Sequence, residues 1–203
     1  MRKTTAAIAA LVAGLGVASA QDMGNVKIGV HAGANWIISN DASSPIVTIG
    51  GGDARVARDF DFDGGAAIGA TAAVMVAESL MVEAEYTFRN NEFAEGATDD
   101  DFNSSAFMVN ALIPMEVDSE TTGYLGAGVG YIMKHDSDRS VPVVDELDGA
   151  FAWQVKTGLD YAIGDRTLGF GLTYLSADFD EEGDDVQVEI GSLMATVALK
   201  FGG

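Results

Sequence analysis

The chain has 203 residues, of which 48% are hydrophobic, 25 are glycine and none is cysteine, and its formal net charge is −20. So acidic a chain argues against nucleic acid or an anionic surface as a partner, because like charges repel. The absence of cysteine excludes a disulfide framework, so the stability of the fold must come from backbone pairing and packing.

The first twenty residues have the pattern of a cleaved export signal. Arg2 and Lys3 form a short positive segment, and residues 6–18 are an unbroken run of small and aliphatic residues. Small residues then precede a cleavage site between Ala20 and Gln21. The apolar run is shorter than the ~20 residues that a membrane-spanning helix needs. We therefore expect an exported protein whose mature domain begins at Gln21.

Alternation of apolar and polar residues predicts eight strands in the mature domain, residues 21–203. The alternation is clearest in the third and sixth strands, because successive side chains of a strand point to opposite faces. A phase break at Gly191 and Ser192 predicts a bulge or a strand start in the eighth strand. The expected strands cover about residues 25–38, 65–77, 82–89, 105–117, 123–134, 151–161 and 168–174, with the last one ending over 193–201.

The expected connections alternate in length. The short ones lie near residues 78–79, 118–122 and 164–166, and the long ones are about residues 39–64, 90–104, 135–149 and 178–187. Short periplasmic turns and long extracellular loops are typical of outer-membrane barrels. The sequence therefore predicts an eight-stranded antiparallel up-and-down transmembrane β-barrel in a bacterial outer membrane, with acidic extracellular loops.

A soluble ligand carrier would show the same alternation, so the direction of the apolar face decides between the two classes. The expected outward aromatics fall near strand ends, as in the two belts of a membrane barrel: Trp36, Phe88, Tyr131 and Trp153 toward the long loops, and Tyr161 and Phe201 toward the short turns. The opposite face holds too many charges for an apolar cavity. We expect these charges to pair inside a polar network of Glu83, Glu85, Arg89, Gln154, Lys156 and Asp160.

Several segments carry a family resemblance, namely Val82–Tyr86, Tyr124–Gly130, Phe151–Gln154 and Gly158–Tyr161. With the strands placed, the chain resembles the opacity-type outer-membrane β-barrel family, related to the transmembrane domain of outer-membrane protein A. The resemblance implies structural membrane proteins, adhesins or surface antigens, and seldom enzymes. It also implies recognition of a terminal aromatic by the barrel-assembly machinery, although Phe201 is followed here by two glycines.

Few residues of the sequence are candidates for a catalytic or metal-binding site. His31 has the phase of the inner face and is expected to be satisfied within the polar network. His135 and Ser137 share a strand face, and with Glu146 they could form the triad of a barrel-type lipid A deacylase, but spacing alone is weak evidence. Acidic residues in Asp180–Asp185 do not match a calcium-binding loop. We expect no catalytic site, no cofactor and no metal.

Two classes of function remain open. The first is a structural or surface-interaction protein: a plugged barrel in contact with outer-membrane lipid and lipopolysaccharide, with acidic loops for an extracellular partner. The alternative is a small cation-preferring pore, which Glu83 and Glu85 would line and which Arg89 and Lys156 would tend to block. Pairing of these charges across the lumen would favour the first class.

Overall fold

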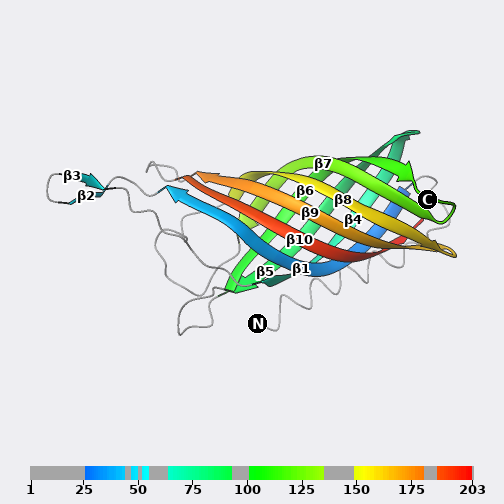
Figure 1. Cartoon of the computed structure of the whole chain (residues 1–203), viewed down its shortest axis with the longest axis horizontal. Helices are drawn as coiled ribbons and strands as arrows, with labels where there is room; N and C mark the ends of the chain where they lie inside the picture. The colour runs from blue at the N-terminus through cyan, green and yellow to red at the C-terminus, as the bar shows by residue number, and fades with distance from the viewer. Residues whose placement is uncertain are drawn as a thin grey trace.

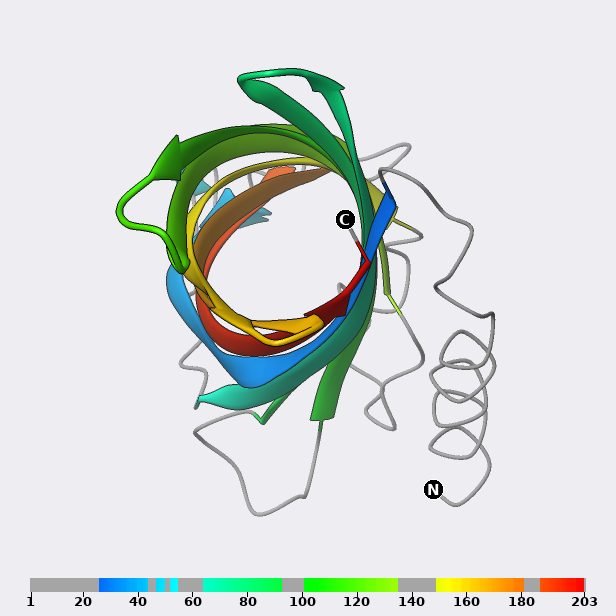
Figure 2. The ribbon, with the colours of Figure 1, turned by 90° about the vertical axis from the view of Figure 1, so that its right-hand side faces the viewer.

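Eight antiparallel strands close into a barrel in the order β1-β10-β9-β8-β7-β6-β5-β4 (Figures 1 and 2). The computed structural model describes residues 26–43, 47–49, 52–54, 64–92, 101–134, 149–180 and 187–202. No helix in these ranges is long and apolar enough to cross a membrane. The barrel strands are β1 (Val26–Ser43), β4 (Gly65–Ala77), β5 (Leu80–Glu92), β6 (Asp101–Glu116), β7 (Thr121–Lys134), β8 (Gly149–Ile163), β9 (Arg166–Asp180) and β10 (Gln187–Phe201).

Three short turns join the strands at one end, which we call the short-turn end; the opposite end is the loop end. The turns lie at residues 78–79, 117–120 and 164–165, as the sequence predicts. Gly164 has a φ of 62°, a conformation that favours glycine in the tight β8–β9 turn. β10 ends at the same short-turn end, where Phe201 pairs with Arg166 beside the β8–β9 turn, and Figure 1 marks the C-terminus there.

Several strands run further toward the loop end than the alternation predicts. β1 continues to Ser43 and β6 begins at Asp101, inside the expected connections. A separate two-stranded sheet, β2 (Val47–Ile49) with β3 (Gly52–Ala54), occupies part of the expected loop 39–64. Strand pairing needs only backbone groups, so a strand can extend where no apolar face marks it in the sequence.

The bulge expected in the last strand lies in its neighbour β1 and not in β10. The register shifts between Ile37 and Ser39 of β1, directly opposite Ser192 and Gly191 of β10. β10 itself pairs without interruption with β9 through this point. The apolar phase of β10 changes at this point because Ile190 packs inward against a buried apolar cluster, whereas Val197 faces outward.

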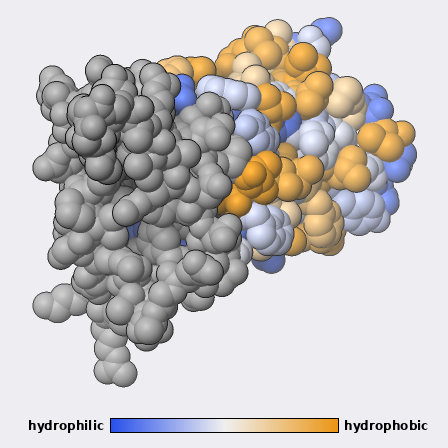
Figure 3. Space-filling model, turned by 60° about the vertical axis from the view of Figure 1, so that its left-hand side comes forward, coloured by the Kyte–Doolittle hydropathy of each residue, from blue (hydrophilic) through white to orange (hydrophobic). Residues whose placement is uncertain are grey.

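The direction of the side chains is as the alternation predicts. Every second residue of β5 is buried, from Met81 to Asn91, and the residues of β8 alternate in the same way. The large side chains on the other face are exposed, among them Trp36, Val109, Leu125, Phe151, Trp153, Leu159 and Phe170. Hydrophobic side chains therefore cover the outside of the barrel wall, on the face that Figure 3 presents, and the charged residues lie inside.

Asp118 organises the turn between β6 and β7. Its Oδ1 accepts the backbone N–H groups of Glu120 at 2.9 Å and Thr121 at 2.8 Å. These backbone hydrogen bonds stabilise the carboxylate and lower the pKa of Asp118 below its ordinary value. A lowered pKa contributes stability that is present above the unfolded-state pKa and is lost as the pH falls through the folded-state pKa.

We therefore expect Asp118→Asn to lower the urea midpoint of unfolding at neutral pH. The difference from the wild type should shrink as the pH is lowered below about 4, where the carboxyl group is protonated in both states. Urea titrations of the two proteins at a series of pH values test this. A difference that stays constant down to the lowest pH would show that the charge of Asp118 does not contribute.

Candidate functional site

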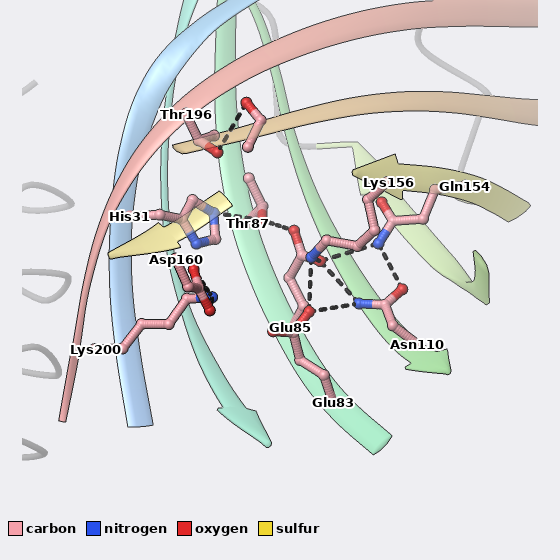
Figure 4. Close-up of polar contacts among 11 residues, drawn as sticks. His31, Glu83, Glu85, Thr87, Asn110, Gln154, Lys156, Asp160, Thr196 and Lys200 are labelled. Atoms are coloured by element: carbon pink, nitrogen blue, oxygen red, sulfur yellow. Dashed lines mark hydrogen bonds and ion pairs between the residues drawn. The ribbon is translucent and has the colours of Figure 1, made fainter. Parts of the chain in front are cut away.

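A buried ion cluster crosses the lumen at mid-height. Nζ of Lys156, on β8, lies 2.6 Å from Oε1 of Glu83 and 2.7 Å from Oε2 of Glu85, both on β5 (Figure 4). β6 and β7 separate these two strands in the barrel wall. Lys156 therefore reaches across the interior to two carboxylates, and all three residues are at most 7% exposed.

Two neutral amides complete the coordination of the carboxylates. Nδ2 of Asn110 donates to Oε1 of Glu83 at 3.1 Å and to Oε2 of Glu85 at 2.9 Å. Nε2 of Gln154 donates to the same Glu85 oxygen at 2.9 Å and to Oδ1 of Asn110 at 2.7 Å. One lysine faces two glutamates here, so these neutral donors help to stabilise the second negative charge.

His31 joins the cluster through Thr87. The Thr87 hydroxyl donates to Oε1 of Glu85 at 2.9 Å, and Nε2 of His31 lies 3.1 Å from the same hydroxyl oxygen. Since the single hydroxyl proton is used on Glu85, His31 must be the donor, with a proton on Nε2. Gly69 leaves room for the imidazole, because a Cβ at this position would lie 2.5 Å from Nε2 of His31.

A second ion pair lies nearer the short-turn end. Nζ of Lys200 is 2.7 Å from both carboxylate oxygens of Asp160, and it lies 5.0 Å from the ring centroid of Tyr124. This pair links β8 to β10 across β9. The two ion pairs and the His31 branch together brace strands on several sides of the barrel (Figure 4).

Apolar layers lie on both sides of the ion cluster. The loop-end layer consists of Ala106, Met108, Ile132, Ala150, Ala152, Leu175 and Ala177, all of them at most 5% exposed. The short-turn layer consists of Ala73, Met81, Leu112 and Tyr124. Apolar side chains therefore also face the interior at these two levels, beside the expected polar network. The cluster of Glu83, Glu85 and Lys156 lies between these two apolar layers. Arg89 lies at the level of the loop-end layer, and Lys200 lies beside Tyr124 of the short-turn layer.

Two small cavities interrupt this packing. One, at the level of the ion cluster, has a volume of about 30 Å³ and is lined by Glu83, Glu85 and Lys156 among others. The other, at the loop end, has a volume of about 20 Å³ and includes Arg89 in its lining. Each has room for one or two water molecules.

The structure places all six residues of the expected polar network inside the barrel, but it does not bring them all together. Glu83, Glu85, Gln154 and Lys156 form one cluster and Asp160 pairs with Lys200. Arg89 is buried apart from them, and its Nε has no hydrogen-bond partner. The expected triad residues His135, Ser137 and Glu146 lie outside the described residues, as does most of Asp180–Asp185.

Sequence reasoning did not single out Asn110, Thr87, Lys200 and Tyr124 as members of this site. Thr87 alternates in phase with the inward glutamates of β5, and Lys200 lies on the inward face of β10. Alternation could therefore have identified both residues as inward-facing. Asn110 lies on a strand whose two faces are both largely apolar, and no pattern marks it. Within the described ranges no group of three or more potential metal ligands occurs.

The outer wall has the features of a membrane-embedded surface. A row of aromatic residues crosses four strands, because Phe107 pairs with Tyr86 and with Tyr131, and Tyr131 pairs in turn with Phe151. Aromatic side chains of this kind gather at membrane interfaces. A closed barrel with an apolar, aromatic-belted wall and a filled lumen is a small transmembrane β-barrel.

The sequence matches the family model of the outer membrane protein beta-barrel domain over residues 5–201. The chain therefore belongs to this family, and the protein is located in the bacterial outer membrane. No curated protein sequence is significantly similar to the chain.

Solved outer-membrane barrels share the fold at low sequence identity. Neisserial surface protein A is 21% identical with a TM-score of 0.54, and the match covers 87% of this chain and 97% of that one. OprG from Pseudomonas aeruginosa is 16% identical with a TM-score of 0.57 and coverage of 89% and 97%. AlkL, solved in lipid bilayers, is 12% identical with a TM-score of 0.56 and coverage of 88% and 90%. At these identities the similarity shows the fold alone.

Proposed function

We propose that this protein is a closed, non-conducting barrel with a structural or surface-interaction role in the outer membrane. The observation that carries the proposal is the layered lumen. Lys156 is held between Glu83 and Glu85, and an apolar layer lies on each side of them. An eight-stranded barrel has an interior just wide enough for side chains to fill, so these layers leave no continuous water path.

The proposal places the function outside the lumen. Outer-membrane lipid and lipopolysaccharide would contact the apolar wall, and the barrel-assembly machinery would insert the chain. Any extracellular partner would bind the acidic connections at the loop end. The proposal includes no catalytic activity, no cofactor and no nucleic-acid partner.

Conductance measurements on the mature chain, residues 21–203, test this proposal. After refolding from urea into a planar lipid bilayer, we expect no steady current steps from a protein whose heat-modifiable mobility on a gel shows that it has folded. Steady steps from the folded protein would overturn the proposal of a closed barrel.

The second candidate is a narrow cation-preferring pore. It is favoured by the two carboxylates of Glu83 and Glu85 at mid-height, beside a cavity that His31 and Lys156 also line. Conduction would require Lys156 to leave both carboxylates and the apolar layers to part. Cation-selective steps in a potassium chloride gradient, larger in Lys156→Met than in the wild type, would support the pore. The absence of current steps from both proteins would support the closed barrel.

A further inference from the structure

Arg89 is a buried cation without a paired anion in the described lumen. It is 3% exposed, and its Nε has no hydrogen-bond partner. The carboxylates that face the described lumen make their ion pairs with lysines: Glu83 and Glu85 share Lys156, and Asp160 pairs with Lys200. Glu85 also attracts Arg89 through space, but the two residues form no ion pair. A guanidinium removed from water is unfavourable unless its charge is compensated and its N–H groups are accepted.

A cavity of about 20 Å³ lies beside Arg89 at the loop end of the lumen. Besides Arg89, its polar lining consists of Asn35, Asn91, Ser104 and Ser192, and aliphatic side chains such as Ile132 and Leu175 contribute the rest. The space corresponds to a single water-sized or chloride-sized occupant. The surrounding apolar wall lowers the local dielectric and strengthens any interaction between that occupant and the guanidinium.

We propose that this cavity binds one small monovalent anion, of the size of chloride, against Arg89. Such an ion only accepts hydrogen bonds, as the unpartnered N–H requires, and it compensates the buried positive charge. Oδ1 of Asn35 lines the same cavity without a partner, and as an acceptor it favours a water molecule that would donate to it. A bridging water is therefore the competing occupant, but a neutral molecule leaves Arg89 without an anion in direct contact.

The test is the dependence of stability on the identity of the anion. The protein is purified from outer membranes in detergent, and its urea midpoint is measured in sodium chloride and in sodium gluconate at equal ionic strength. Because a ligand that binds only the folded state stabilises it, the midpoint should rise with chloride concentration and not with gluconate. Arg89→Gln should abolish the chloride effect. The matched control Arg166→Gln removes an arginine that is 58% exposed, and it should retain the effect.

Equal midpoints in the two salts for the wild type would overturn the proposal and leave water, or a carboxylate of the chain itself, beside Arg89. A chloride effect that persists in Arg89→Gln would overturn it as well. If Arg89→Gln does not fold, wild-type crystals grown in sodium bromide decide the question. An anomalous peak within contact distance of Arg89 would support the site, and its absence would contradict it.

Discussion

Replacing Lys156 by methionine is expected to lower the free energy of unfolding by about 3–5 kcal/mol. The substitution keeps an unbranched side chain, shorter by one atom, but leaves Glu83 and Glu85 side by side without a cation. Their remaining donors are the neutral groups of Asn110, Gln154 and Thr87. Two buried carboxylates without a counter-ion repel each other and stay poorly solvated. Urea titration of the folded barrel in lipid vesicles measures the loss.

The controls for this prediction separate lost charge from lost packing. Combining Lys156→Met with Glu83→Gln and Glu85→Gln removes the stranded charges, so the triple variant should recover most of the stability. Arg166→Met deletes an exposed cation outside the lumen and should change the midpoint little. An unchanged midpoint for Lys156→Met would mean that the ion cluster contributes nothing to the barrel.

Alternation identified the inward charges, but it could not identify their partners. Period two assigns Glu83, Glu85 and Lys156 to the inner face, yet it says nothing about their heights in the lumen. Lys156 is 73 residues from Glu83 in the chain, and the two meet only through the register of the intervening strands β6 and β7. That register depends on strand tilt and turn length, which no short window of sequence contains.

The weak alternation of some strands has a structural cause. On β6, Met108 and Leu112 are buried inside the barrel while Phe107 and Val109 face outward. Both faces of the strand are therefore apolar, and the period-two signal disappears. The apolar layers of the lumen are thus the part of the interior that alternation does not identify. The polar band, by contrast, lies where β5 and β8 alternate most strictly.

Gly128→Ala is expected to lower the free energy of unfolding by roughly 2–5 kcal/mol, since it combines forced overpacking with lost hydrogen bonds to a charged group. A Cβ at this position would overlap Oδ1 of Asn110 and lie 2.8 Å from the backbone oxygen of Val109. Asn110 would have to withdraw from Glu83 and Glu85, to which its amide donates.

Gly123→Ala is the matched control on the same strand. Its added Cβ would have no neighbour closer than 3.6 Å, so the variant should unfold near the wild-type midpoint. Urea titration of both variants tests whether β7 needs glycine for its backbone conformation or for the space that the Asn110 side chain occupies next to Gly128. If the two variants lost equal stability, glycine would matter through the strand itself. A large loss confined to Gly128→Ala would show that the glycine makes room for Asn110 beside the ion cluster, so that a residue of the wall determines how the lumen is packed.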